Sequence, residues 1–361
     1  KVTAPSGPRP HTPYKTPVMS TSWAQNNPSA SLEYFEATAA TILATQLSSG
    51  AIPWFEAGKI DPWDHVEAAM GLASMNHIEA TVSAYDWLAD QQTSSGGWYV
   101  AYDHTGVTDD SRIETNFVAY VAVGIWHLYL VTKDRDLLGR YWDMVNQAIN
   151  FVIERQAPTG EIYWAEDKTL GLRKDALVTG CSSIYLSLLC GTKIAAALTK
   201  PQARWQQSAK RLRVAITDHP EAFDRTWPSK ARFSMDWFYP VLTGVITEDN
   251  ARSRIDARWN EFVVSGLGCR CVNDEPWVTV AETCELVMSL SAVGDFDRAN
   301  ALFEWIQQFR ADDGSYWTGY VYKDEVLWPD ERTTWTAGAV LLASDTLTGR
   351  TAGSQLFLAD R

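Results

Sequence analysis

Residues 117–131 read FVAYVAVGIWHLYLV, an apolar run whose main exceptions are Gly124 and His127. A helix that is apolar on all sides has to be buried on all sides. Residues 205–216, WQQSAKRLRVAI, show a different pattern, because their apolar residues return every three to four positions and leave Lys and Arg on the other face. That pattern predicts a half-buried surface helix. The two stretches therefore represent two kinds of helix, one inner and one outer.

The same pair of helices recurs six times along the chain. Outer helices are expected near 31–48, 77–92, 135–156, 205–216, 250–264 and 295–310. Inner helices are expected to begin close to Trp63, Ser111, Ala176, Ser234, Val278 and Arg332, at intervals of 44 to 65 residues. Such a period indicates a repeat architecture. Twelve alternating helices bury their apolar faces by closing into a ring, so we predict an all-α fold, an (α/α)6 barrel or α/α toroid of six helical hairpins with inner and outer helix rings.

The 361 residues are expected to form one domain with a short leading arm. Residues 1–27 contain five prolines among Ser, Thr and Gly, which favours an extended N-terminal arm. From residue 28 to residue 361 the unit recurs without a linker-like break. This part is therefore predicted to be a single (α/α)6 barrel domain.

Charge and composition restrict the partners. The formal net charge is −13 and the 31 Lys and Arg residues are scattered, which argues against binding to nucleic acid or to an anionic membrane. No apolar run approaches the roughly 20 residues of a membrane span, so no integral membrane segment is expected. Five cysteines in a long chain do not suggest a disulfide framework and favour a cytoplasmic location. The chain begins with Lys rather than Met, which leaves a removed secretory leader open.

No cofactor and no metal is expected. Cys269 and Cys271 are too close together for the usual zinc pair, and no His follows His219 to complete a site. The sequence also has no glycine-rich phosphate loop and no Gly-x-Ser-x-Gly nucleophile turn. The expected partner is a small-molecule or oligosaccharide substrate, and the oligomeric state stays open.

Aromatic and acidic residues gather in the loops that lead from an outer to an inner helix. All six loops precede an inner helix, so they lie on one rim of the predicted barrel, and the loops of the other rim are short. Indole faces stack on sugar rings or stabilise a cation. The candidate substrate-binding residues are Trp54, Trp63, His65, Trp98, Tyr102, Trp164, Trp237, Trp277, Trp317 and Glu331. For any single tryptophan, and for His65, the alternative is a packing role inside the barrel.

The acids of this rim have two interpretations. Three pairs match a capping pattern at the first turn of an inner helix, namely Asp64-x-x-Glu67, Ser111-x-x-Glu114 and Thr279-x-x-Glu282. The N-terminal ends of six inner helices also converge on one pocket, where the same carboxylates would reach a substrate. Asp109 and Asp110 are adjacent and exceed what a cap needs, which favours a functional role for them.

The rim loops also repeat a pattern of Gln, Gly and an aromatic residue. It occurs as Gln46…Gly50…Trp54, Gln91-Gln92…Gly96-Gly97-Trp98, Gln156…Gly160…Trp164 and Gln307-Gln308…Gly314-Ser315-Tyr316-Trp317. This pattern resembles the Gln/Trp repeats of terpenoid cyclase and protein prenyltransferase toroids, and the six-pair layout resembles the six-hairpin glycosidases. Bacterial proteins of this kind are often called prenyltransferase-like. The resemblance covers nearly the whole chain and implies the fold.

Two departures separate the chain from the cyclases and the prenyltransferases. The triterpene-type cyclases carry Asp-x-Asp-Asp, whereas Val107-Thr108-Asp109-Asp110 lacks the first Asp. The protein prenyltransferases bind zinc with a late His, which this chain does not have after His219. A rim lined by acids without a basic cluster is also a poor site for a diphosphate.

We therefore predict a carbohydrate-active enzyme, similar to the six-hairpin glycosidases, that acts on a glycosidic bond. One carboxyl protonates the leaving oxygen, and the other activates water or attacks carbon. Opposite units of the ring suggest a first pair formed by Asp110, with Glu114 beside it, and Glu282. A second pair is Asp64 and Asp236, and Asp109 is a further catalytic candidate. An inverting enzyme would hold the acting carboxyls about 6.5–9.5 Å apart and a retaining one about 5–5.5 Å apart.

Two other functions stay open at this point. A terpenoid cyclase, dehydratase or isomerase would use Asp109 or Asp110 as the proton donor, with the aromatic rings guiding a cation. A non-catalytic toroid would use the same rings and acids to bind a glycan without cleaving it.

Overall fold

The computed structural model describes residues 32–358, which are mostly helical. The predicted arm at 1–27 lies outside the described residues, and the single domain predicted for 28–361 stays a prediction. The inner helices are α3 (Pro62–Ser74), α5 (Thr115–Thr132), α8 (Val178–Ala197), α10 (Ser234–Leu242), α12 (Val280–Ala292) and α14 (Thr334–Thr348). The outer helices are α2 (Leu32–Thr45), α4 (Ile78–Gln91), α6 (Arg135–Arg140), α7 (Trp142–Ile153), α9 (Ala203–Asp218), α11 (Glu248–Phe262) and α13 (Phe296–Ile306).

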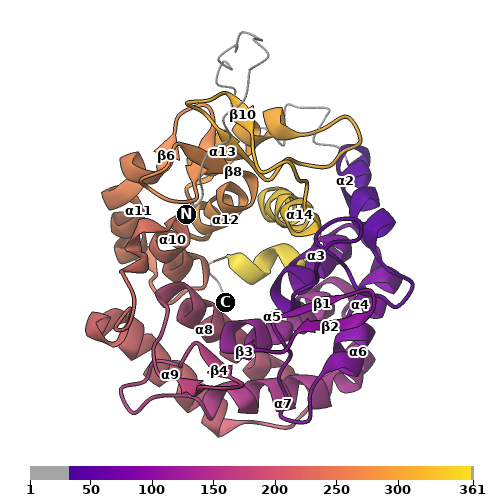
Figure 1. Cartoon of the computed structure of the whole chain (residues 1–361), viewed down its shortest axis with the longest axis vertical. Helices are drawn as coiled ribbons and strands as arrows, with labels where there is room; N and C mark the ends of the chain where they lie inside the picture. The colour runs from indigo at the N-terminus through magenta and orange to yellow at the C-terminus, as the bar shows by residue number, and fades with distance from the viewer. Residues whose placement is uncertain (1–31, 359–361) are drawn as a thin grey trace.

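The six inner helices contact one another in ring order. The contacts run from α3 to α5, α8, α10, α12 and α14, and α14 returns to α3. Figure 1 shows this ring with the outer helices around it. The last contact is a close approach of two backbones, because a Cβ atom at Gly71 would lie only 2.7 Å from the Cα of Gly338. A larger residue at either position would push α3 and α14 apart.

The repeated Gln and Gly residues join consecutive outer helices. The Nε2 groups of Gln46, Gln92 and Gln156 each donate to the carbonyl of the glycine four residues later and to a carbonyl of the next outer helix. Those glycines, at 50, 96 and 160, have positive φ and touch the backbone of the same helix. Gly314 does the same against Ala37 of α2. The last unit therefore contacts the first.

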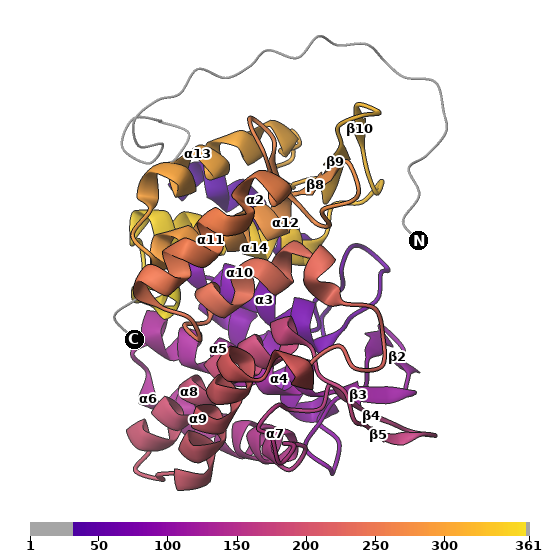
Figure 2. The same cartoon turned by 90° about the vertical axis from the view of Figure 1, so that its left-hand side faces the viewer.

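Short strands form in the outer-to-inner loops, so the described part of the fold contains some sheet beside its helices, unlike the all-α prediction. They are β1 (Ala101–Asp103), β2 (Gly106–Asp109), β3 (Arg112–Glu114), β4 (Ala165–Asp167), β5 (Gly171–Arg173), β6 (Val263–Val264), β7 (Gly268–Arg270), β8 (Trp277–Thr279), β9 (Gly319–Val321) and β10 (Val326–Leu327). Pairing of β3 with β4 and of β8 with β9 connects neighbouring loops. Figure 2 shows the labelled strands on one side of the molecule, which is the predicted loop-rich rim.

The opposite end of the ring has short connections. There the 3-10 helix η5 (Ala352–Phe357) contacts α5, α12 and α14, and Figure 1 shows it inside the ring. The other 3-10 helices are η2 (Pro220–Ala222), η3 (Lys230–Arg232) and η4 (Gln307–Phe309), all in outer-to-inner loops. The ring is thus closed at one end and lined by long loops at the other.

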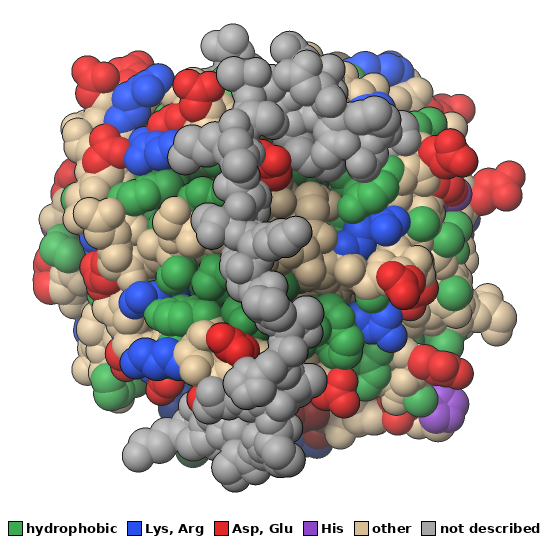
Figure 3. Space-filling view, turned by 90° about the horizontal axis from the view of Figure 1, so that it is seen from above, with side chains coloured by type: hydrophobic (Ala, Val, Ile, Leu, Met, Phe, Trp, Pro, Cys, Tyr) green, Lys and Arg blue, Asp and Glu red, His purple; other side chains and the backbone are tan. Residues whose placement is uncertain are grey.

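Two inner helices combine length with strong apolarity. α5 and α8, with 18 and 20 residues, are long and apolar enough to cross a membrane by composition, but their apolar windows are 61% and 72% buried in the ring. Both therefore have the burial expected of core helices. On the face seen in Figure 3, basic and acidic side chains are interspersed, in agreement with the scattered charge of the sequence.

Candidate active site

A pocket of about 240 Å³ opens at the loop-rich end, beside the first turns of α3 and α5. We call it the mouth pocket. It is lined by Trp54, Lys59, Asp61, Asp64, Val100, Ala101, Asp109, Arg112, Glu114 and Phe117. Four carboxyl groups, two cations and apolar side chains therefore share one small volume. Such a combination suits a ligand that is polar in places and apolar in others.

Asp61 organises the start of α3. Its Oδ1 accepts a hydrogen bond from the backbone N–H of Asp64 at 2.9 Å, and its Oδ2 accepts one from Nε1 of Trp54 at 2.8 Å. Asp61 is thus the N-cap, followed by Pro62 at the first helical position. The capping interpretation of Asp64 and Glu67 is wrong, and their carboxyls are not used for that purpose.

Asp64 is placed to retain a proton. It lies in the wall of the mouth pocket, where loss of water around its carboxyl raises its pKa well above the ordinary value. The charge of Asp61 and a hydrogen bond between the two side chains raise the pKa further, and Lys59 opposes this. A raised pKa favours the protonated form of a carboxyl, which is the form that acts as a general acid.

Both cations of the mouth pocket are engaged with neighbouring groups. The Nζ of Lys59 lies 3.7 Å from the ring centroid of Trp54. Nε of Arg112 donates to Oε1 of Glu114 at 2.8 Å. Burial nevertheless raises the pKa of Glu114, with Arg112 opposing the rise. Glu114 stands at the N-cap of α5 without a capping side-chain hydrogen bond, so the capping interpretation is wrong here too.

The adjacent acids Asp109 and Asp110 have different environments. Asp109 lines the mouth pocket, and its Oδ1 accepts a hydrogen bond from the backbone N–H of Ser111 at 2.9 Å. Hydrogen bonds from Ser111 lower the pKa of Asp109, which favours the ionised form. Asp110 is exposed and forms an ion pair with Lys168 at the surface. The structure thus brings Asp109 into the site and directs Asp110 to solvent.

Three aromatic side chains lie next to this acid-rich turn of α3, and we call them the aromatic floor. Trp63 stacks on Tyr120 of α5, with ring centroids 3.8 Å apart and an interplanar angle of 12°. Its ring centroid is also 6.3 Å from that of Tyr239 on α10. Because α10 lies across the ring from α3, the Trp63 indole extends over the barrel axis.

Two buried acids lie one turn deeper than the floor. Glu67 and Glu285 line a cavity of about 10 Å³, which Phe357 of η5 also borders. The hydroxyl of Tyr120 donates to Glu67, and that of Tyr239 donates to Glu285, each at 2.7 Å. Burial raises the pKa of Glu67 to about 7. Burial and the charge of Glu67 raise that of Glu285 well above its ordinary value.

Glu282 belongs to the first turn of α12, and α14 separates α12 from α3 in the ring. The Thr279 side chain makes no capping hydrogen bond, so the capping interpretation is wrong for this pair as well. Glu282 lies near Cys271 and Glu285, because its charge raises the pKa of both groups. Glu67 thus raises the pKa of Asp64, and Glu67 and Glu282 both raise that of Glu285, so each of the four carboxyls is close to another one.

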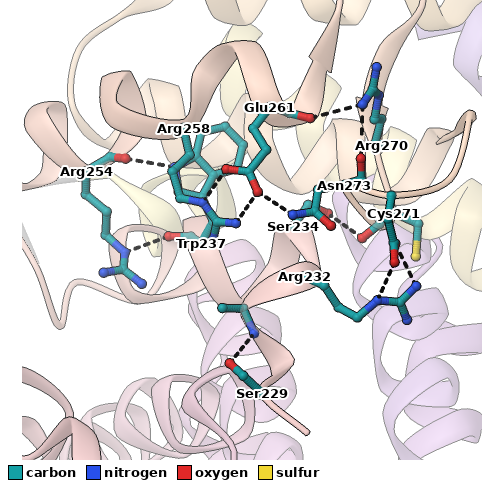
Figure 4. A network of polar contacts seen from close by, with 12 residues as sticks. Ser229, Arg232, Ser234, Trp237, Arg254, Arg258, Glu261, Arg270, Cys271 and Asn273 are labelled. Carbon is teal, nitrogen blue, oxygen red and sulfur yellow. Dashed lines mark hydrogen bonds and ion pairs between the residues drawn. The ribbon is translucent and has the colours of Figure 1, made fainter.

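Asp236 faces away from these acids. It lines a separate pocket of about 420 Å³ together with Arg254 of the outer helix α11, and burial raises its pKa to about 6. Figure 4 shows Arg254 and Trp237 joined by reciprocal hydrogen bonds, from Nε of Arg254 to the Trp237 carbonyl and from Nε1 of Trp237 to the Arg254 carbonyl. The structure thus directs Asp236 and Trp237 toward α11, and it does not bring Asp236 to Asp64.

The remaining predicted aromatic residues form two groups. Trp98 and Tyr102 are fully buried and hydrogen bond to backbone groups of Leu88 and Tyr99. Those contacts pack the second loop against α4. The other group, Trp164, Trp277 and Trp317, is half-buried in the third, fifth and sixth rim loops, outside the mouth pocket.

His65 and Glu331 complete the predicted set. His65 is fully buried, its Nδ1 accepts the N–H of Ile52, and its Nε2 donates to the Ala84 carbonyl. Burial lowers the pKa of His65 to about 4, so it is neutral and ties α3 to its neighbours. Glu331 is half-buried near Lys59, whose charge opposes the rise of the Glu331 pKa caused by burial.

Several residues of the site escaped the sequence analysis. The mouth pocket is lined by Asp61, Lys59 and Arg112. The small buried cavity is lined by Tyr120, Tyr239 and Glu285. The signal for Asp61 is the Asp-Pro pair at the start of an apolar stretch, which is typical of an N-cap followed by N1. Among residues 32–358, no group of three or more His, Cys, Asp or Glu side chains is arranged to hold a metal ion. The five cysteines are free thiols.

The solved structures that resemble the chain in fold include glycosidases. A glycosidase in complex with glucose matches with a TM-score of 0.69 at 16% identity, over 88% of this chain and 96% of that one. The GH63 mannosylglycerate hydrolase from Thermus thermophilus, solved in complex with Tris, matches with a TM-score of 0.66 at 13% identity, over 85% and 99%. A D-mannose isomerase matches with a TM-score of 0.64 at 12% identity, over 90% and 99%. These likenesses concern the fold.

A sequence relative defines the family. The chain is 49% identical over 320 residues to the MMP endo-(1,4)-3-O-methyl-alpha-D-mannosidase of Mycolicibacterium hassiacum, covering 89% of this chain and 88% of the relative. No family model matches the chain. The protein belongs to the family of this mannosidase and is a glycoside hydrolase-like enzyme.

Proposed function

We propose that the protein is an endo-acting α-mannosidase that hydrolyses α-(1,4) bonds in oligosaccharides of 3-O-methylmannose. The observation that carries this proposal is the 49% identity to the M. hassiacum mannosidase across most of both chains. The closed order of the inner helices supports the finer description of the fold as an (α/α)6 barrel of six hairpins.

Asp64 is the general acid of the proposed reaction. It lies in the mouth pocket, and its raised pKa favours the protonated form of the carboxyl. This proton passes to the glycosidic oxygen as the bond from that oxygen to the anomeric carbon breaks. Asp61 supports this role, because its charge disfavours ionisation of Asp64 and its cap fixes the first turn of α3.

Glu282 is the second carboxylate of the proposed reaction. It takes a proton from a water molecule while the water oxygen bonds to the anomeric carbon, so the water supplies the hydroxyl of the new reducing end. Asp64 and Glu282 come from inner helices that are not ring neighbours, since α14 lies between α3 and α12. We propose that a water molecule lies between the two carboxyls and that the anomeric carbon is inverted.

The lining of the mouth pocket is consistent with a methylated sugar. Asp109 and Glu114 offer hydrogen-bond acceptors and Arg112 offers donors for hydroxyl groups. Trp54 and Phe117 offer apolar surface for the sugar faces and the methyl ether. The half-buried Trp164, Trp277 and Trp317 on neighbouring loops are proposed to stack on further sugar units of the chain.

The same lining disfavours the terpenoid alternative. Four carboxyls and two cations would all have to lose water to accommodate a hydrocarbon in a pocket of about 240 Å³. That desolvation is costly because none of these groups would gain a hydrogen bond from the ligand.

Hydrolysis of a defined oligosaccharide tests the proposal. Wild-type protein is incubated with an α-(1,4)-linked 3-O-methylmannose oligosaccharide, with the unmethylated oligosaccharide and with a prenyl alcohol, and products are followed by mass spectrometry. Internal cleavage of the methylated substrate, with a β-anomer appearing first by proton NMR, is the expected result. Conversion of the prenyl alcohol without any sugar cleavage would overturn it, and an α-anomer would overturn the inverting step.

A further inference from the structure

The buried acids Glu67 and Glu285 have no part in the proposed bond cleavage. They are 3% and 5% exposed, and they approach the same small cavity from α3 and α12. An acid in such a place costs free energy unless it is protonated or hydrogen bonded. Two acids facing one cavity therefore indicate a specific use.

Each acid holds one tyrosine of the aromatic floor. Glu67 accepts the hydroxyl of Tyr120, and Glu285 accepts the hydroxyl of Tyr239, both at 2.7 Å. Tyr120 lies flat against the Trp63 indole, whereas Tyr239 approaches it at 44°. Contacts therefore run from both carboxyls, through two phenol rings, to one indole.

No Lys or Arg side chain is among the groups that shift the pKa of Glu67 or Glu285. Glu67 faces Tyr120 from α5, Tyr85 from α4 and Tyr239 from α10, and Glu285 faces Tyr239, Glu67 and Glu282. The charge of Glu67 also raises the pKa values of Asp64 on α3 and Cys284 on α12. Two full negative charges are strongly disfavoured there, so a neutral amide is a fair substitute for either carboxyl.

We propose that Glu67 and Glu285 are positioning residues of the sugar site, which hold Tyr120 and Tyr239 and thereby fix the Trp63 indole as a platform for a sugar ring. This inference rests on the proposed function, because the ring that stacks on Trp63 belongs to the oligosaccharide. The two acids act through the floor and do not touch the substrate.

Steady-state kinetics on the methylated oligosaccharide test this role with matched variants. Glu67→Ala and Glu285→Ala remove the acceptor of a tyrosine hydroxyl, and each should raise KM about three- to tenfold, the value of one buried hydrogen bond. The kcat should change less than KM. Glu67→Gln and Glu285→Gln keep an acceptor oxygen and should restore KM to within about twofold of wild type.

Two further variants protect the test against misfolding. Ser183→Ala removes a hydroxyl without a partner from the same cavity and should leave KM unchanged. Tyr120→Phe retains the aromatic ring but loses the hydroxyl that donates to Glu67, so it should reproduce the KM of Glu67→Ala. Alanine variants with the KM of Ser183→Ala, or glutamine variants as impaired as the alanine variants, would overturn the proposal.

A structural readout separates this inference from the proposed function. In a crystal structure of Glu67→Ala, the Trp63 indole should rotate away from its stack on Tyr120, and an unchanged indole would overturn the positioning role. If wild-type protein fails to cleave the oligosaccharide, the proposed function is wrong, while the orientation of Trp63 in this variant still decides whether the acids position it.

Discussion

The start of α3 and the segment before α5 are both rich in acids, but the acids have different environments in the two regions. At the start of α3, Asp64 and Glu67 are withdrawn from water and lie beside other acids, and the pKa of each is raised. In the segment before α5, Asp110 pairs with Lys168 in solvent, and Glu114 pairs with Arg112. Burial therefore favours the protonated form of the acids in the first region, whereas in the second region a hydrogen bond lowers the pKa of Asp109 and Arg112 opposes the rise of the Glu114 pKa.

This comparison explains why acidic motifs alone do not locate a catalytic acid. The adjacent Asp109 and Asp110 are the more conspicuous pattern in the sequence, yet Asp109 accepts a hydrogen bond that lowers its pKa and Asp110 pairs with a surface lysine. A general acid near neutral pH instead needs burial and negative neighbours, as Asp64 has. The two regions can therefore be tested against each other.

The largest expected effect separates Asp64 from Asp110. Asp64→Asn removes the proposed proton donor and should lower kcat by about 10²- to 10⁴-fold. Asp110→Asn removes only a surface charge and should leave kcat within about threefold of wild type. Both are measured on the methylated oligosaccharide at the pH of maximal activity. Equal losses of kcat in the two variants would show that Asp64 and Asp110 do not differ in the way proposed.

The fold was open to prediction because it depends on local patterns. The apolar run at 117–131 and the amphipathic run at 205–216 lie within α5 and α9. The short strands were harder to place, because β3 pairs with β4 and β8 with β9 across separate loops. Such pairing depends on which loops become neighbours in the ring.

The candidate site was open to prediction only as a set of residue types on one rim. Asp64 and Glu282 are among the six candidate acids, but tertiary partners decide how each acid is used. Lys168, which pairs with Asp110, is 58 positions away in the sequence. Asp236 lines a pocket together with Arg254 of the outer helix α11. The Gln residues of the repeated loop pattern connect outer helices through backbone carbonyls, a role that the pattern alone does not reveal.

A second prediction concerns the pH dependence of stability. The pKa of Glu67 is about 7 in the folded protein and near the ordinary value of 4.5 when unfolded. Between these values the folded state binds more protons, so the free energy of unfolding should fall as pH rises, by up to about 3 kcal/mol. Glu67→Gln cannot ionise and should show a smaller decline, because only the contributions of other buried acids such as Asp64 and Glu285 remain; urea unfolding at pH 5 and pH 8 measures the difference.

A control variant makes the pH effect specific. Glu79→Gln changes an exposed acid on α4 and should retain the decline of the wild-type protein. If Glu67→Gln and Glu79→Gln show the same pH dependence, Glu67 is not the source, and the buried acids differ less from surface acids than we infer.

The third prediction separates the two roles of Asp61. Asp61→Ala removes the N-cap of α3 and the partner of Trp54, and should cost about 1–2 kcal/mol of stability. Asp61→Asn keeps a capping oxygen but removes the charge that raises the pKa of Asp64. The alkaline limb of its pH–rate profile should therefore move to lower pH, since Asp64 then loses its proton earlier. An unmoved limb in Asp61→Asn would remove Asp61 from the control of the acid.

The smallest expected effect belongs to the surface pair in the second region. Lys168→Ala breaks the ion pair with Asp110, whose partners are both largely in solvent. Solvent and salt screen such a pair, so the melting temperature should change by no more than about 2 °C and kcat/KM should stay the same. Arg112→Ala is the matched change at a less exposed pair in the same segment and should be the more damaging of the two, because it leaves the half-buried Glu114 without its cation. A large loss of activity in Lys168→Ala would mean that Asp110 works as part of the site. The proposed distinction between a catalytic acid at the start of α3 and surface acids before α5 would then be wrong.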